Sequence, residues 1–150
     1  MALTPNSAIL PQTPRSALAQ IVNSNGTGLV PLVTGGANAS KVSSIVATNT
    51  DTNAYTLQLV VNVGGSLSGG VVTGGAAYPI AAVSVPASAG NVAGTPPVGI
   101  LGAATIPGVA LDNAGAPYLY VNPGNYLCIA LTAAVTSGRL VSAVATLADF

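Results

Sequence analysis

Residues 54–63 read AYTLQLVVNV, and this stretch decides the fold class. Its side chains alternate with a period of two, which is the repeat of a β-strand that buries one face. The run 41–48, KVSSIVAT, is a second predicted strand, and the polar cluster 49–53 is the turn between them. In the predicted strand 54–63, one face carries Tyr55, Leu57, Leu59, Val61 and Val63, and the other carries Thr56, Gln58, Val60 and Asn62.

The C-terminal third predicts three more strands separated by two turns. In the first turn, Asn122 to Asn125, Pro123 presets φ and Gly124 accepts the positive φ that a type II turn requires. The second turn covers residues 136–139. The three predicted strands are PYLYV (117–121), YLCIALTAAV (126–135) and LVSAVATLADF (140–150).

The middle of the chain is rich in glycine and proline. Residues 78–85, YPIAAVSV, are bounded by Pro79 near the start and by Pro86 after the end, which favours an edge strand. Glycine pairs at 64–65, 69–70 and 74–75 predict an irregular loop, because glycine is costly to order. An alternative is a loop whose backbone approaches a neighbouring subunit closely.

Composition favours sheet over helix along the whole chain. Half of the 150 residues are hydrophobic, and 18 Gly and 11 Pro would interrupt helices repeatedly. We therefore expect an all-β protein, an antiparallel β-sandwich or jelly roll over residues 39–150. Residues 1–38 are expected to form an extended Pro-rich N-terminal arm, in which Ser16–Val22 is the one weak helical candidate.

Charge is scarce, which bears on the choice of partners. The chain has three basic and three acidic residues and no net charge, a composition that promotes self-association. Three separated basic residues cannot form the positive stripe that nucleic-acid binding needs. The uncharged stretch 52–111 contains too many prolines for a membrane-spanning helix. The N-terminus does not resemble a secretory signal, so synthesis in the cytoplasm is expected.

The residues of catalysis are mostly missing. The sequence has no His, no Glu and one cysteine, so a catalytic triad or a metal cluster cannot be built within one chain. We expect neither an enzyme nor a bound cofactor or metal. Asp51 and Asp112 lie in turn contexts and are expected to bind their own backbone, with calcium between subunits as the alternative. Cys128, between Leu127 and Ile129, is expected to be a buried small apolar residue.

Six residues are candidate interface positions. The three cations are either partners for aspartates of another subunit or solvated charges, and the sequence favours neither interpretation. Tyrosines cluster around the predicted Asn122–Asn125 turn and could anchor an interface. The candidates are Arg15, Lys41, Tyr118, Tyr120, Arg139 and Phe150.

Two segments carry a resemblance to a known class of proteins. KVSSIVATNTDTNAYTLQLVV (41–61) and YLYVNPGNYLCIAL (118–131), followed by a final short strand, resemble tailed-bacteriophage capsid decoration (cement) proteins over about half of the chain. The resemblance implies a homotrimer on the virion surface that binds major capsid subunits, and it carries over no catalytic residue. A phage tail or fibre component is the alternative. A carbohydrate-binding β-sandwich module is a further one, although the chain has no Trp.

Overall fold

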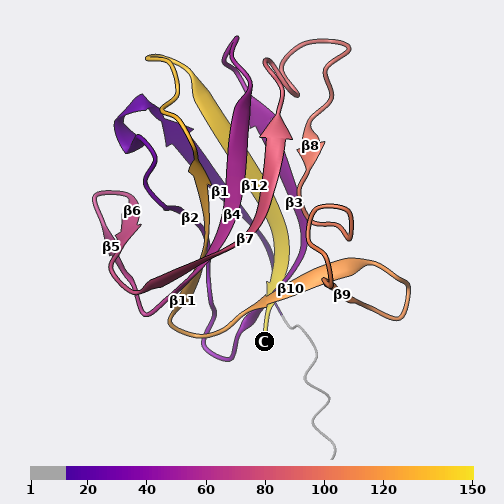
Figure 1. Cartoon of the computed structure of the whole chain (residues 1–150). Helices are drawn as coiled ribbons and strands as arrows, with labels where there is room; N and C mark the ends of the chain where they lie inside the picture. The colour runs from indigo at the N-terminus through magenta and orange to yellow at the C-terminus, as the bar shows by residue number, and fades with distance from the viewer. Residues whose placement is uncertain (1–12) are drawn as a thin grey trace, which may run out of the picture.

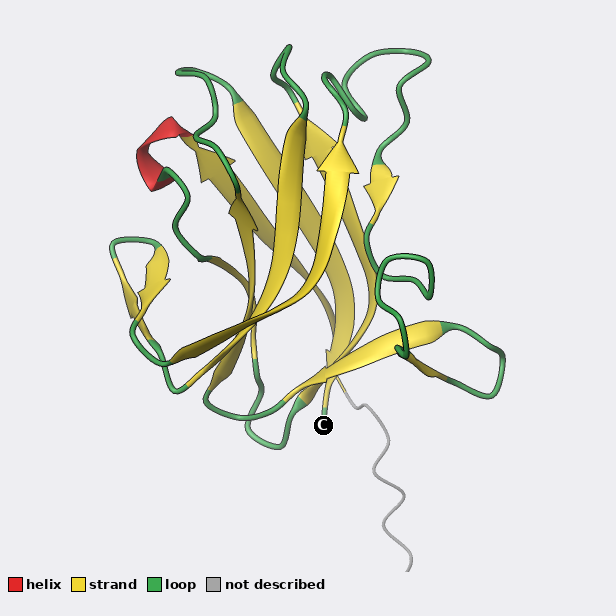
Figure 2. Cartoon of the chain, viewed as in Figure 1, coloured by secondary structure: helices red, strands yellow, loops and turns green. Residues whose placement is uncertain are grey.

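Two antiparallel sheets face each other in the computed structural model of the chain, which describes residues 13–150 (Figure 1). Strands and loops make up nearly all of these residues (Figure 2), and the predicted all-β sandwich is confirmed. The first sheet contains, in order, β1 (Thr13–Val22), β12 (Leu140–Asp149), β3 (Ser40–Asn49), β10 (Pro117–Val121) and β9 (Ala110–Leu111), with β8 (Val98–Gly99) also paired to β3. The second contains β2 (Val30–Thr34), β11 (Asn125–Leu131), β4 (Tyr55–Val63) and β7 (Ala76–Val85).

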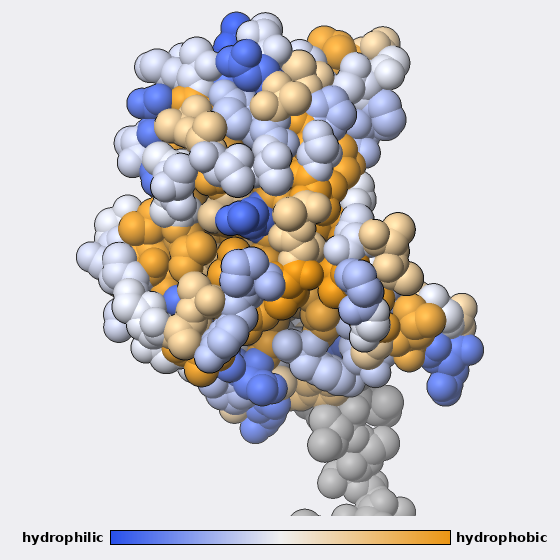
Figure 3. All heavy atoms as spheres, viewed as in Figure 1, coloured by the Kyte–Doolittle hydropathy of each residue, from blue (hydrophilic) through white to orange (hydrophobic). Residues whose placement is uncertain are grey.

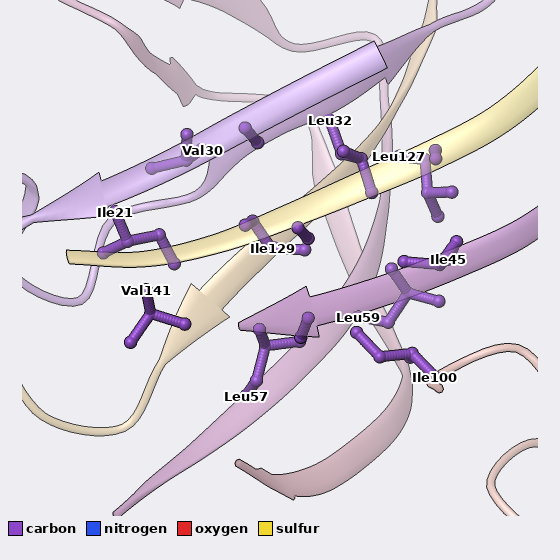
Figure 4. Packing of buried hydrophobic residues seen from close by; sticks show 14 of the residues in the cluster. Ile21, Val30, Leu32, Ile45, Leu57, Leu59, Ile100, Leu127, Ile129 and Val141 are labelled. Carbon is purple, nitrogen blue, oxygen red and sulfur yellow. The ribbon is translucent and has the colours of Figure 1, made fainter. Parts of the chain in front are cut away.

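The core lies between the two sheets and is aliphatic (Figure 4). Alternate residues of each strand point inward, as the period-two pattern of β4 predicted. Leu57 and Leu59 of β4 are fully buried, and so is Ile129 of β11 beside them. Ile21 of β1 and Ile45 of β3 close the core from the opposite sheet. Burying each such side chain contributes about 1.5–3 kcal/mol to the stability of the fold. Thin layers of Val, Ile, Leu and Ala therefore suffice to hold the two sheets together.

A small second core covers the outer face of the second sheet. Val60 of β4 and Cys128 of β11 point away from the main core and contact Val72. Val72 belongs to a hairpin formed by β5 (Ser66–Ser68) and β6 (Val71–Thr73). The glycine-rich segment is therefore a folded hairpin, and the prediction of an irregular loop is wrong. Its turn residues Gly69 and Gly70 have φ of 57° and 82°, the two positive values that a type I′ turn requires.

Two local predictions from proline and glycine are confirmed. Gly124 has a φ of 74°, and the Asn125 N–H donates to the Asn122 carbonyl at 3.1 Å, which closes the predicted turn. Strand β7 lies at the edge of its sheet, as its prolines indicated. Pro79 occupies the point where the pairing with β4 shifts register, a position that tolerates a missing N–H donor.

The predicted arm over residues 1–38 needs correction. Residues 13–22 form β1, which pairs with β12 along its full length, and residues 30–34 form β2 at the edge of the other sheet. Ser16–Val22 is strand and not helix, because Ala19 and Ile21 alternate into the core. The connection between the strands contains the short 3₁₀ helix η1 (Asn23–Asn25). The sandwich thus begins at least as early as residue 13, and residues 1–12 lie outside the described residues.

Candidate interface

Four of the six candidate residues meet on the outer face of the first sheet. Tyr120 of β10 is the register partner of Lys41 on β3, and Tyr118 lies two residues earlier on the same face. Phe150 follows the last residue of β12, beside the start of β3. The four side chains, Lys41, Tyr118, Tyr120 and Phe150, form what we call the aromatic patch, near the C-terminus marked in Figure 1.

The aromatic patch is held together by its own contacts. The rings of Tyr118 and Tyr120 meet edge to face with centroids 5.2 Å apart, and the rings of Tyr120 and Phe150 are 5.7 Å apart. The Lys41 Nζ lies 4.5 Å from the centroid of the Tyr118 ring, which is a cation–π contact. Tyr120 nevertheless remains 53% exposed, so the cluster offers apolar surface to a partner.

The backbone around Phe150 fixes its position. Its N–H donates to the Ala39 carbonyl at 3.2 Å, and the Asn38 side-chain amide donates to the Phe150 carbonyl at 3.2 Å. These bonds attach the residue to the loop before β3. Because the rings are already positioned, a partner would lose little conformational entropy in ordering them.

Arg15 lies at the same end of the sheet but on its inner side. Its Nε donates to Asp149 Oδ2 at 2.7 Å, and its Nη2 donates to Asp149 Oδ1 and to the Thr34 carbonyl. Asp149 also accepts a hydrogen bond from the Ser40 hydroxyl. The hydrogen bonds from Arg15, and to a lesser extent the one from Ser40, lower the pKa of the Asp149 carboxyl. Arg15 is thus paired within its own chain, and neither of the two sequence interpretations was right for it.

Arg139 lies at the other end of the first sheet from the aromatic patch. It ends the turn that precedes β12, whereas Phe150 follows that ten-residue strand. Its side chain is exposed, and no ion pair in residues 13–150 includes it. The structure therefore places four of the predicted candidates together, Arg15 behind them and Arg139 apart.

Both turn aspartates bind their own backbone, as predicted. Asp51 accepts the Asn53 N–H at 3.2 Å and is buried, and Asp112 accepts the N–H groups of Ala114 and Ala116 at 2.9 Å. Within residues 13–150, no three His, Cys, Asp or Glu residues lie close enough to hold a metal ion. Calcium bound between subunits stays a prediction for Asp51 and Asp112.

Cys128 does not have the environment of a reactive nucleophile. Cys128 is fully buried, and this desolvation raises the pKa of its thiol to about 11, so it stays protonated. A surface hollow beside the 90–97 loop is lined by glycine, proline, Asn91, Val92 and Thr95, without a titratable side chain. The described residues also contain no helix with the length and apolar character needed to cross a bilayer.

Sequence reasoning missed an apolar row on the outer face of the first sheet. Leu18 of β1, Val144 of β12 and Val46 of β3 are register partners across three strands. Leu18 is 59% exposed and Val144 is 45% exposed. Reading residues 13–22 as a strand would have revealed Leu18, because it alternates out of phase with Ala19 and Ile21. Figure 3 draws a different face of the molecule, on the side of β4 and β7, where orange and pale atoms lie between scattered blue ones.

No protein-family model, curated protein or solved structure matches this chain. The likeness to capsid decoration proteins therefore remains a prediction from the sequence alone.

Proposed function

We propose that the protein is a structural virion subunit that binds the outer surface of major capsid subunits in a tailed phage. The observation that supports this most directly is the aromatic patch, a set of positioned rings with one cation on a surface that carries few charges. Aromatic residues dominate the binding energy of many protein interfaces, and the adjoining neutral surface can exclude water around them. Tyr120 would be the anchor, since it is the most exposed ring of the patch among residues 13–150.

Co-sedimentation with capsids of the phage that encodes the chain tests this proposal. Wild-type protein should pellet with capsids in a saturable manner. Tyr120→Ala should weaken binding by about tenfold or more, which corresponds to at least ~1.4 kcal/mol. Arg139→Ala is the matched control, because this exposed residue lies at the far end of the sheet, and it should bind as wild type. Capsids that bind no wild-type protein would refute the proposal.

The native mass tests the trimer that the resemblance implies. A trimer would have a mass near three times 14.4 kDa. Open-ended polymers, or binding to isolated tails in place of capsids, would favour the tail or fibre alternative. A deletion intended to test an N-terminal arm must stop at residue 12, because residues 13–22 form β1.

The carbohydrate-binding alternative has one observation in its favour, the exposed tyrosine rings. Sugar stacking needs an open aromatic face, however, and Lys41 lies over the ring of Tyr118. Of Tyr118 and Tyr120, only Tyr120 is more than half exposed. A glycan array with clear binding that Tyr120→Ala abolishes would support this alternative over the capsid proposal.

A further inference from the structure

Strand β1 leaves one long edge of the first sheet open. It pairs with β12 over all ten residues from Thr13 to Val22, and no described strand pairs with its other side. An unpaired edge presents N–H and C=O groups that can add another strand. Natural proteins usually protect such edges against the addition of another strand. The backbone N–H and C=O groups of β1 that remain unpaired therefore determine which strand can pair with it.

The pairing of β12 shows which groups of β1 are open. The Leu140 carbonyl accepts the Thr50 N–H at 2.9 Å, and the Thr146 carbonyl accepts the Ser43 hydroxyl at 3.1 Å, so even-numbered residues of β12 direct their backbone toward β3. The direction alternates along a strand, and odd-numbered residues therefore face β1. Their register partners are the odd-numbered residues of β1, for example Ile21 opposite Val141. The even-numbered residues of β1 consequently direct their N–H and C=O groups outward.

Both ends of this open edge are blocked. Pro14 has no N–H to donate. At the other end, the Val22 N–H already donates to Asn25 Oδ1 at 2.8 Å. Complete donor and acceptor pairs remain at Ser16, Leu18 and Gln20, whose side chains are all exposed. Outside the sheet ladders, no hydrogen bond within residues 13–150 uses the backbone of these three residues.

The other sheet edges are less suited to strand addition. Edge strand β7 contains Pro79 and a shift in register, and β2 is five residues long and contains Pro31. Strand β9 has two residues. Edges with prolines, irregular pairing or short length resist the approach of another strand. Among the described strands, β1 is the one that offers a regular ladder.

We propose that β1 pairs antiparallel with β1 of a second copy of this chain, about a two-fold axis at Leu18. This register places Leu18 opposite its own copy and Ser16 opposite Gln20 of the partner. Every open N–H then meets an open carbonyl. Pro14 falls opposite Val22, so the residue without an N–H faces the residue whose N–H is already used. The pattern of open and blocked groups is thus complementary to itself, as a two-fold interface requires.

Charge and apolar contacts agree with this pairing. Arg15 is the only charged residue of β1, and its ion pair with Asp149 neutralises it within each copy. In the proposed register Arg15 lies opposite Ile21, so no like charges face each other. Leu18 would contact its own copy and extend the row formed with Val144 and Val46 across both subunits. The result is a continuous sheet through two sandwiches.

The concentration dependence of the native mass tests the pairing and separates it from the trimer considered above. Light scattering from low micromolar to near-millimolar protein should show a monomer converting to a mass of twice 14.4 kDa. A monomer at every concentration, or a trimer, would overturn the proposal. Capsid binding could still succeed or fail independently, because the aromatic patch and the β1 edge are separate surfaces.

Charge exchange at Leu18 tests the position of the axis. Leu18→Lys places like charges opposite each other and should weaken self-association by about tenfold or more, and Leu18→Asp should do the same. An equimolar mixture of the two variants should recover the dimer. Val144→Lys is the matched control, because Val144 is similarly exposed on the same face but one strand from the axis, and it should still dimerise. A dimer that survives Leu18→Lys, or a mixture that stays monomeric, would contradict this axis.

Removal of one open N–H tests the hydrogen-bond ladder itself. Leu18→Pro deletes a donor at the axis and leaves the bonds between β1 and β12 intact, because the Leu18 N–H faces away from β12. The variant should fold, as circular dichroism can verify, and should dimerise at least about tenfold more weakly than Leu18→Ala. Equal association of the two variants would show that the ladder does not form.

Discussion

The Tyr55 hydroxyl donates a 2.6 Å hydrogen bond to Asp51 Oδ2, and this oxygen also accepts the Thr136 N–H at 2.9 Å. Asp51 belongs to the turn between β3 and β4, whereas Thr136 belongs to the turn before β12. The buried carboxylate therefore joins two connections that lie far apart in the sequence. Its hydrogen bonds replace the water that burial removes, which is the condition for keeping an anion inside a fold.

Tyr55→Phe should destabilise the protein. The change removes the donor that contributes most to stabilising the ionised form of Asp51, while the carboxylate stays buried. We expect the thermal midpoint to fall by several degrees, as measured by circular dichroism. Tyr78→Phe is the control, because the Tyr78 ring is 56% exposed, and its midpoint should match wild type. Equal midpoints for the two variants would mean that the Tyr55–Asp51 bond adds no stability.

Stability should fall in acid and stay level near neutrality. Hydrogen bonds lower the pKa values of all three aspartate carboxyls in the folded state. The main donors are Tyr55 for Asp51, the Ala116 N–H for Asp112 and Arg15 for Asp149. The unfolded chain, with Asp pKa values of about 3.9, then binds more protons than the folded one at low pH. The resulting stability is fully present above about pH 5 and is lost as the pH falls through the folded pKa values.

Thermal unfolding between pH 2 and pH 7.5 checks this dependence. The midpoint should be level at the neutral end, because the sequence has no His or Glu, and should decline below about pH 4. Asp51→Asn should be less stable than wild type at pH 7 and should lose less on acidification. A midpoint that rises in acid would have the wrong sign for lowered carboxyl pKa values.

Cys128 should behave as a buried apolar side chain. Its thiol contacts Val60 and Val72 beneath the β5–β6 hairpin, and a hydroxyl in that place would lose its hydrogen bonds to water. We expect Cys128→Ser to lower the free energy of unfolding by about 1–3 kcal/mol in urea and to cost more than Cys128→Ala. The native thiol should resist a thiol reagent at pH 8 until the chain unfolds. Rapid labelling would imply that the hairpin opens readily.

Two glycines of the same hairpin region should differ sharply in tolerance. A Cβ on Gly75, which has a φ of 67°, would lie 2.5 Å from the Gly65 nitrogen and 2.5 Å from the Val63 carbonyl oxygen. Gly69 has a φ of 57°, but a Cβ there meets nothing within 4 Å. Gly69→Ala should therefore cost only the backbone term of about 1–2 kcal/mol, and Gly75→Ala should cost clearly more. Urea unfolding compares them, and equal costs would contradict the close approach at Gly75.

Much of the sandwich could be predicted because its period-two strands are local signals. The alternation in β4, the Pro123–Gly124 turn and the proline-marked edge strand β7 each depend on neighbouring residues alone. Strand β1 was missed because Ala17 and Ala19 give a weak inward pattern and Pro14 suggested an arm. The hairpin was missed because paired glycines indicate a flexible loop as readily as a type I′ turn.

The candidate interface was predictable only in part, since its members converge through strand pairing. Tyr118 and Tyr120 could be found from their place beside the Asn122–Asn125 turn. Their contact with Phe150 depends on β12 and β10 both pairing with β3, and sequence spacing does not reveal strand order. The ion pair of Arg15 joins residues 134 positions apart, a separation at which the sequence gives no signal.

Thr13 and Asp149 are register partners at the same end of the first sheet, close to the aromatic patch. A short linker could therefore join Phe150 to Thr13 in a chain without residues 1–12, and new termini could be opened at the exposed Gly69–Gly70 turn. Such a circular permutant would keep every strand pair while changing the order in which the strands are synthesised. The same proximity affects protein engineering, because a tag fused after Phe150 would sit against the aromatic patch, whereas one inserted at Gly69–Gly70 would leave the patch uncovered.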